Sequence, residues 1–452
     1  MRLKISGGRL FDPAASRHGE VRDLYVDGGR MVPHLSRVDR VIEARDRLVA
    51  PGGIDLRGQV ATYGLNFRRG AGGLPTVREL GERYAALGYT HVHEPFLTLY
   101  TANYVHCQLA ALPVVDTSAS LVLNLRDLDL WLASPDRRQE IKETVAFFLD
   151  RTRALNLRVV EPRVRYRQEF YAHRQVPGAA ALEVLADLAR VQQVPLNLEA
   201  ASEVLRAELP EPRAFHLAAL GPALREEELL EAALRQLQQG ASADMGLMDP
   251  FGAGQAGADI RVDLGWFEPL NLSPSADKDA ARRALGLALQ YQGEGLAFSG
   301  AAASVAGVEA FPRLFSWLGN RLARRRDWGE DLGSREYSVS QWVWATRVLP
   351  ARLLGLTDRG SLRAGARADV AIYDPAPGAA GQWPGRCCTL LKAGEMVVEN
   401  YTLINPEVAR ATYFRSTEAQ ATPLVEEICQ YRSFRPENLW VQPELEVEWK
   451  QV

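Results

Sequence analysis

Residues 75–96, PTVRELGERYAALGYTHVHEPF, contain one complete helix-to-strand unit. Thr76 and Glu79 have the spacing of a capping box, which predicts a helix that begins after Thr76 and runs to Leu87. Gly88 fits the position just beyond that helix, where left-handed backbone is common. The apolar run that follows is typical of a buried strand.

The same alternation recurs through the middle of the chain. Helices predicted at 137–154, 179–193, 225–239 and 279–291 each lead into a short apolar strand. About seven or eight such strands fit between residues 51 and 300, which favours an α/β fold of the (β/α)8 barrel type over a doubly wound sheet. No GxGxxG sequence follows the first strand, which disfavours a dinucleotide-binding fold.

Strand-like sequence with Gly, Pro and Asp turns occupies both ends of the chain, at 1–50 and again after residue 360. These ends are expected to form one small composite β-sandwich domain. The predicted division is therefore composite domain (1–50 and 356–405), barrel (51–355) and a C-terminal extension (406–452) that is a possible partner-binding arm.

Composition restricts the functions that are possible. The 452 residues carry a formal charge of −3, which argues against nucleic acid as the main partner. Of 53 basic residues only five are lysine, and there are seven histidines and four cysteines, so few metal centres can be built. The sequence contains no signal-peptide or membrane-spanning run and no CxxC pair, so a reduced, cytoplasmic protein without a membrane partner is expected.

Several segments resemble a known family. Three of them are similar to the amidohydrolase superfamily: VAPGGIDL (49–56), TRVLPARLLGLTDRGSLRAGARADVAIYDP (346–375) and LKAGEMVVEN (391–400). Three others narrow the resemblance to the A subunit of formylmethanofuran dehydrogenase, which has a counterpart in the formyltransferase/hydrolase complex of methylotrophic bacteria: ALGYTHVHEPF (86–96), LPVVD (112–116) and REYSVSQWVWATRVLPARLLGL (335–356). The resemblance implies an amidohydrolase-type barrel with the composite β-domain.

The resemblance also implies two zinc ions at the barrel mouth, held by histidines, a carboxylated lysine and an aspartate. This sequence departs from that pattern at the positions concerned, which are Arg57, Gln59, Arg158, Asn197, Glu199 and Ala301. Arginine stays charged and offers no lone pair, so Arg57 and Arg158 cannot be ligands. We therefore expect no catalytic residues, no metal and no binuclear zinc, and a cofactor site that is unknown.

Five polar residues remain as candidates for the barrel mouth: His91, His93, Glu94, His106 and His216. His91 and His93 are two residues apart and share one strand face, so together with His106 and Glu199 they could form a relocated metal site. The alternative, which we favour, is that they are polar residues lining an inactive barrel or hydrogen-bonded in its core. His216 could occupy the single remaining histidine position, and Asn197 and Glu199 could bind a small polar ligand.

Three further features admit a partner-binding and a structural interpretation. They are the Trp342–Trp344 pair, the basic run of Arg321, Arg324, Arg325 and Arg326, and the tail 430–452. Trp is enriched at interface hot spots, although core packing is the more frequent use of such a pair. The tail lacks a helical period, and an extended arm across another subunit is slightly favoured over an edge strand of the β-domain.

The favoured function is a pseudoenzyme. The chain would be a catalytically degenerate, structural or partner-binding subunit of a formyltransferase/hydrolase-type complex in one-carbon metabolism, where the resemblance implies tetrahydromethanopterin or a methanofuran-like carrier. Since fold alone does not fix function, two alternatives stand beside it. One is an active hydrolase that removes formyl groups from a non-peptide C–N bond with a rebuilt or metal-free site. The other is a binding module whose Arg57 and Arg158 meet an anionic ligand.

Overall fold

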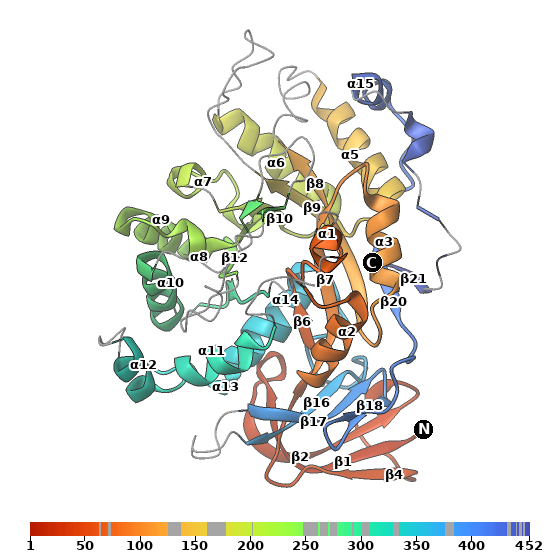
Figure 1. Ribbon diagram of the computed structural model, residues 1–452, viewed down its shortest axis with the longest axis vertical. Helices are drawn as coiled ribbons and strands as arrows, with labels where there is room; N and C mark the ends of the chain where they lie inside the picture. The colour runs from red at the N-terminus through yellow and green to blue at the C-terminus, as the bar shows by residue number, and fades with distance from the viewer. Residues whose placement is uncertain are drawn as a thin grey trace.

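A computed structural model describes the chain in two connected parts, a helix-covered parallel sheet and a smaller sheet at one end of it (Figure 1). The described residues are 1–62, 65–70, 74–124, 137–160, 178–200, 202–246, 261–262, 270–271, 278–291, 293–300, 308–328, 334–375, 384–431, 435–439, 441–442, 445 and 448–452.

Eight parallel strands follow one another in chain order in the larger sheet, each beside the next. They are β6 (Gly53–Asp55), β7 (Tyr89–Leu97), β8 (Asp116–Asn124), β9 (Asn156–Val160), β10 (Leu196–Glu199), β11 (Phe215–Ala218), β12 (Ser242–Asp244) and β15 (Leu296–Ala297). Just beyond β15, the backbone N–H of Gly300 donates to Asp55 of β6 over 2.8 Å, which links the last strand to the first. The predicted (β/α)8 barrel is confirmed.

The four helices expected between the middle strands are also present. They are α5 (Arg138–Thr152), α6 (Gly178–Gln192), α9 (Glu227–Gln238) and α10 (Lys278–Gln290). The other main helices of the barrel layer are α2 (Val77–Ala86), α3 (Ala102–Ala110), α11 (Ala310–Leu318), α12 (Arg321–Trp328), α13 (Val339–Val343) and α14 (Leu349–Leu353). Shorter helical segments are α1 (Leu65–Gly70), α7 (Ser202–Arg206) and α8 (Leu220–Ala223).

The capping box predicted for α2 is formed. The hydroxyl of Thr76 accepts the Glu79 N–H at 3.2 Å, and the Glu79 carboxylate accepts the Thr76 N–H at 2.7 Å. Gly88 follows with φ +81°, and a Cβ there would collide with Tyr373 of the small sheet. Glycine is therefore required at position 88 for two reasons, which are its backbone conformation and the close approach of the barrel to the small sheet.

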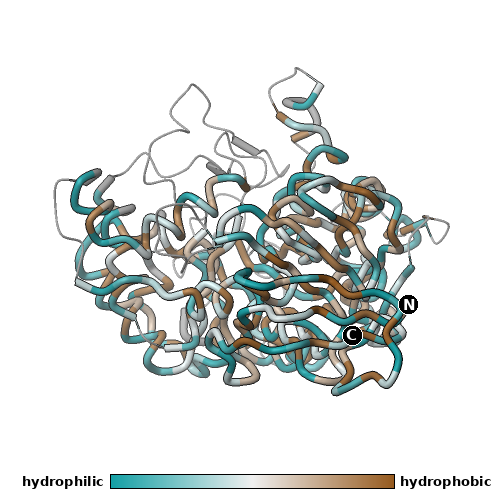
Figure 2. The backbone as a smooth tube through the Cα atoms, turned by 90° about the horizontal axis from the view of Figure 1, so that it is seen from below, coloured by the Kyte–Doolittle hydropathy of each residue, from teal (hydrophilic) through white to brown (hydrophobic). Residues whose placement is uncertain are grey.

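The small sheet draws its strands from both ends of the chain, as expected. Its strands are β1 (Leu3–Asp12), β2 (Arg17–Asp27), β3 (Arg30–Val32), β4 (Arg40–Glu43), β5 (Leu48–Pro51), β16 (Val370–Pro375), β17 (Pro384–Lys392), β18 (Glu395–Glu399) and β19 (Thr402–Leu403). The two halves join where β5 pairs antiparallel with β16, with Val49 opposite Ile372. Figure 2 views the molecule from the side of the small sheet, and hydrophobic and hydrophilic stretches alternate along the backbone. The small sheet has a hydrophobic core that is separate from the core of the barrel, and the side chains of Ile5, Val26 and Ile372 belong to it.

The C-terminal segment packs on the barrel. Strand β20 (Ala411–Phe414) lies parallel to the first part of β8, with Thr412 opposite Thr117. Strand β21 (Glu448–Gln451) pairs with β20, and α15 (Pro423–Tyr431) lies against α5 (Figure 1). The sequence slightly favoured an arm laid across another subunit for residues 430–452. The structure instead seats 448–451 on the chain's own barrel sheet, because β8 extends below the start of β9 and leaves an edge for β20.

A buried charged cluster joins the barrel to the small sheet at the base of β8. The Asp116 carboxylate accepts from Lys392 Nζ at 2.7 Å, from Arg367 at 3.1 Å, and from Arg359. These three cations hold the pKa of Asp116 well below its usual range, although burial alone would raise it. The tyrosine hydroxyl of Tyr413, on β20, accepts from Arg359 at 2.6 Å, so this cluster ties three chain segments together.

The four cysteines are all unpaired, as the sequence indicated. Cys387, Cys388 and Cys429 are buried, and burial raises the pKa of the Cys387 thiol to about 12. They therefore behave as small apolar groups of the core.

Candidate functional site: the barrel mouth

A column of polar side chains lies inside the barrel below its mouth. Ser118 Oγ lies 2.8 Å from His91 Nε2 and 2.8 Å from His93 Nδ1, and His93 Nε2 lies 2.6 Å from Ser120 Oγ. The prediction that His91 and His93 share one strand face is thus confirmed. Burial lowers the pKa of His93 to about 3 and that of His91 also well below its usual value, so both rings are neutral. They are hydrogen-bonded core histidines.

The carboxylate of Asp55 lies at the end of β6 and is surrounded by protein donors. It accepts from the Tyr84 hydroxyl at 2.7 Å, from the Gly300 N–H at 2.8 Å and from the Arg57 N–H at 3.0 Å. Burial nevertheless raises the pKa of Asp55. These bonds fix the turn from which the Arg57 side chain projects.

Glu94, on β7, holds the loop that follows β6. Its carboxylate accepts from the Ala61 N–H at 2.7 Å, from the Thr62 hydroxyl at 2.8 Å and from the Phe96 N–H at 3.1 Å. The side chain is fully buried, and burial raises its pKa. Glu94 is therefore a loop anchor, with both oxygens already occupied.

Asp244, at the end of β12, is a site residue that sequence reasoning missed. Its oxygens accept from the Gly246 N–H at 2.9 Å, the Ala219 N–H at 3.2 Å and the Ser299 hydroxyl, and His216 Nε2 lies 3.2 Å away. The bond from His216 and the charge of Arg57 hold the pKa of Asp244 well below its usual range. The only sequence signal was an acidic residue at the end of a predicted strand.

Two arginines occupy the same region and have fewer partners than these carboxylates. Arg57 and Arg158 are 8% and 2% exposed, and the Arg158 guanidinium lies 5.0 Å from the centre of the Phe96 ring. Across the residues that the structure describes, Arg57 Nε and Arg158 Nε and Nη2 have no hydrogen-bond acceptor. Burial and the charge of Arg57 lower the pKa of Arg158 to about 10, so it stays protonated at neutral pH.

The remaining candidate residues divide between the barrel interior and other places. Asn197 donates to Ser120 Oγ at 3.4 Å, within the polar column. His106 lies on α3, where Nε2 is 2.9 Å from the Thr152 carbonyl and the ring packs edge-on against Trp449. It therefore does not join His91 and His93 as the relocated metal site would require. Ala301 lies outside the described residues.

The tryptophan pair and the basic run are both divided between core and surface. Trp342 is buried and its ring lies 3.8 Å from the Arg347 guanidinium, whereas Trp344 is partly exposed and donates to the Glu294 carbonyl at 2.8 Å. In α12, Arg324 is 1% exposed and donates to backbone carbonyls at 318 and 335, while Arg321, Arg325 and Arg326 are exposed. Core packing thus accounts for one member of each group.

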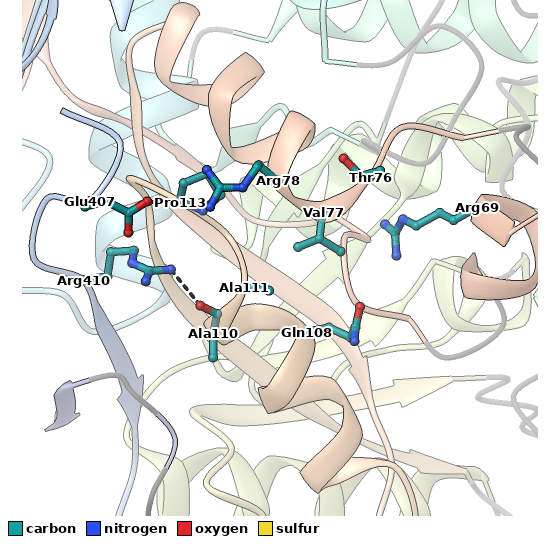
Figure 3. Close-up of a pocket in the computed structure, with 10 residues that line it drawn as sticks. All are labelled: Arg69, Thr76, Val77, Arg78, Gln108, Ala110, Ala111, Pro113, Glu407 and Arg410. Atoms are coloured by element: carbon teal, nitrogen blue, oxygen red, sulfur yellow. Dashed lines mark hydrogen bonds and ion pairs between the residues drawn. The ribbon is translucent and has the colours of Figure 1, made fainter. Parts of the chain in front are cut away.

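A pocket of about 480 Å³ lies outside the barrel, between α2, α3 and the segment that leads to β20 (Figure 3). In Figure 3, Arg69 approaches from one side, and Arg78, Glu407 and Arg410 gather on the other. Arg410 donates to the Ala110 carbonyl at 2.7 Å, and Arg78 lies 3.6 Å from Glu407. These interactions hold the C-terminal segment against the helices, so the pocket lies at a structural contact between two parts of the chain.

Comparison with known proteins agrees with this architecture. A model of the amidohydrolase family matches residues 288–387. The chain is 26% identical over 496 aligned residues, covering 88% of this chain and 89% of the relative, to the Fhc A subunit of the formyltransferase/hydrolase complex of Methylorubrum extorquens. It is 25% identical over 182 residues, 36% of this chain and 32% of the relative, to protein FwdA of Methanocaldococcus jannaschii.

The chain thus resembles the amidohydrolase family. Two solved structures share its fold. The formyltransferase/hydrolase complex FhcABCD of Methylorubrum extorquens, in complex with methylofuran, contains a chain that superposes with a TM-score of 0.84 at 22% identity, over 100% of this chain and 99% of that one. Dihydropyrimidinase from Brevibacillus agri superposes with a TM-score of 0.58 at 14% identity, over 94% and 100%.

The zinc pair that the superfamily resemblance implies does not fit the side chains of this barrel. Two of the expected ligand positions carry guanidinium groups, which repel a metal cation, and Gln59 offers only an amide. His216 is engaged through both ring nitrogens, by Ser242 at 3.0 Å and by Asp244. Within the part of the chain that the structure describes, no three His, Cys, Asp or Glu side chains come together as a metal site.

The chain contains no helix, among its described residues, that is both long and apolar enough to cross a lipid bilayer.

Proposed function

We propose that the chain is a catalytically degenerate amidohydrolase-like subunit that acts by binding partner subunits in a formyltransferase/hydrolase-type complex of one-carbon metabolism. The observation that carries the proposal is the burial of Arg57 and Arg158 at the barrel mouth, at positions where the resemblance implies metal ligands. The full-length superposition on a chain of the FhcABCD complex supports the choice of complex.

The arginines support a lost metal site because they can replace part of its electrostatic role. Buried carboxylates need positive charge nearby, which a zinc pair supplies in an active barrel. Here the charge of Arg57 helps keep Asp244 ionised, and Glu199 and Asp244 in turn favour the charged form of Arg158. A guanidinium can balance these charges, yet it cannot activate a water molecule as zinc does.

The alternative of an active hydrolase with a rebuilt site has one observation in its favour, the His216–Asp244 pair. Such a pair resembles the orienting half of a general-base arrangement. However, His216 is 2% exposed and both of its ring nitrogens are within hydrogen-bond reach of Ser242 or Asp244. No nitrogen is left to take a proton from a water molecule, so the geometry favours a structural role for this pair.

Exposed hydrophobic side chains offer surfaces for a partner. Leu322 of α12 is 79% exposed between the exposed Arg321 and Arg325, and Val21 of the small sheet is 67% exposed. An acidic partner subunit with an apolar contact would suit the α12 surface.

Two measurements on the full chain test this function. Metal analysis of protein purified without chelators should find far less than one zinc per chain. Co-expression of the tagged chain with homologues of the other three Fhc subunits should yield a single complex on gel filtration. Stoichiometric zinc that disappears in a His91→Ala/His93→Ala variant, together with deformylation by the isolated chain, would favour the active hydrolase. A chain that elutes alone from every co-expression would exclude the partner-binding role.

A further inference from the structure

The barrel mouth contains polar groups that the protein itself leaves without partners. Gln59 is fully buried, in left-handed backbone with φ +49°, and neither its Nε2 nor its Oε1 is hydrogen-bonded. The same holds for Arg57 Nε, for Arg158 Nε and Nη2, and for Glu199 Oε2, in the described part of the chain. Arg57 and Glu199 both lie close enough to Arg158 to affect its charge, and Gln59 is two residues along the chain from Arg57. An unpaired buried polar atom costs about 1–3 kcal/mol, so these four residues require an explanation.

The carboxylates beside these groups cannot supply the missing bonds. Asp55, Glu94 and Asp244 each accept at least three hydrogen bonds from backbone N–H groups, hydroxyls or His216. Their oxygens are thereby held toward the loops and strand ends. Arg57 Nε and Arg158 Nε and Nη2 are left with negative charge nearby but without an acceptor, among the residues that the structure describes.

The position of both arginines is fixed by the fold. Arg57 follows directly from the Asp55 turn, and its Nη1 would lie 3.2 Å from a Cβ at Gly246, so that the glycine makes room for the guanidinium. The Arg158 guanidinium is held against the Phe96 ring. Donors that are immobilised before binding lose little conformational entropy when an acceptor arrives, which is the usual property of a built site.

The geometry points to a binding site at the barrel mouth, formed by Arg57, Gln59 and Arg158, for a small molecule that carries a carboxylate and a hydroxyl or N–H group. A planar carboxylate matches the geometry of the guanidinium N–H donors. Because the acidic residues Glu199 and Asp244 lie near the site, a ligand with one negative charge suits it better than a ligand with two. The hydroxyl or N–H group of the ligand would donate to one of the two unpaired acceptors, Gln59 Oε1 and Glu199 Oε2. A dianionic phosphate would be repelled by the same acidic residues.

This site is independent of the proposed assembly, because it needs neither zinc nor another subunit. The test uses the purified full chain and follows its thermal midpoint as glycolate is added at constant ionic strength, with acetate and phosphate in parallel. Glycolate should raise the midpoint saturably, because a ligand that binds only the folded state stabilises it. Acetate should act more weakly, since it lacks the hydroxyl.

Three variants locate the effect. Arg158→Met should weaken glycolate binding about tenfold or more, as expected for the loss of charge-assisted hydrogen bonds, and Arg57→Met should do the same. Arg352→Met, on the exposed surface, should leave binding unchanged.

The inference is overturned by any of three results. These are the lack of a saturable response to glycolate, a response to phosphate alone, and glycolate binding that survives in both Arg57→Met and Arg158→Met.

Discussion

The ammonium group of Lys392 lies 2.7 Å from a carboxylate oxygen of Asp116, and neither side chain is exposed to solvent. The pair joins β17 of the small sheet to the base of β8 in the barrel. Because Arg359 and Arg367 contact the same carboxylate, one aspartate is the shared partner of three cations, two of them buried.

Asp116→Asn should therefore be strongly destabilising. The amide keeps the shape of the side chain but leaves Lys392 without the Asp116 carboxylate and leaves Arg359 and Arg367 with Asp369 alone. Breaking a buried ion pair costs about 3–5 kcal/mol. Denaturant unfolding measures the loss. Asp39→Asn, at an ion pair with Arg2 near the surface, should leave the midpoint almost unchanged. Equal, small effects of both substitutions would show that the cluster contributes little.

Acid should destabilise the protein through His106. Burial lowers the pKa of His106 to about 4, against about 6.5 for an unfolded histidine. Between these values the unfolded chain binds more protons, so stability is lost as the pH falls from about 6.5 to 4. His106→Gln retains a donor toward the Thr152 carbonyl and cannot titrate. The difference in unfolding free energy between the variant and the wild type should therefore shift by about 2 kcal/mol in favour of the variant when the pH is lowered from 6.5 to 5. Unfolding curves recorded at both pH values measure this shift. A constant difference would contradict a neutral buried ring.

Gly246→Ala should disturb the barrel mouth through Arg57. The new methyl group would lie 3.2 Å from Arg57 Nη1, in backbone with φ +67° that disfavours a side chain. A loss of about 1–3 kcal/mol is expected. A double-mutant cycle with Arg57→Ala separates the two causes, because truncating the arginine relieves only the steric part. Strict additivity would mean that Arg57 does not lie against Gly246.

Trp449→Ala distinguishes a packed tail from a partner-binding arm. The indole lies 5.1 Å from the His106 ring and 5.8 Å from the Phe414 ring, centre to centre. Its removal should lower the stability of the isolated chain by about 1–3 kcal/mol, less than for a fully buried tryptophan. If the isolated variant had the stability of the wild type but failed to assemble with its partners, the tail would act as a partner-binding arm instead.

The sequence predicted those parts of the fold that have a local signal. Thr76 and Glu79 predicted the start of α2, Gly88 its end, and the spacing of His91 and His93 their common face. The position of β20 had no such signal, because its partner β8 lies far away in the chain and pairing depends on an edge that only the folded barrel provides. The sequence directed attention to the barrel mouth through Arg57 and Arg158, which the structure buries there, and their proposed origin as replaced metal ligands stays a prediction. Asp244 was missed, since a single acidic residue at a strand end has many possible roles.

The pairing of β20 with β8 also has a consequence for the order in which the protein can fold. Thr412 bonds Thr117, a residue made 295 positions earlier. At about 5–20 residues per second, a ribosome needs about 15–60 s to deliver β20 after β8 has emerged. Throughout that time the lower edge of β8 has open backbone groups, and Asp116 lacks its cations until residues 359–392 are made. The nascent chain is therefore open to chaperones or proteases until late in synthesis, and only a chain that has passed residue 414 can cover this edge of β8.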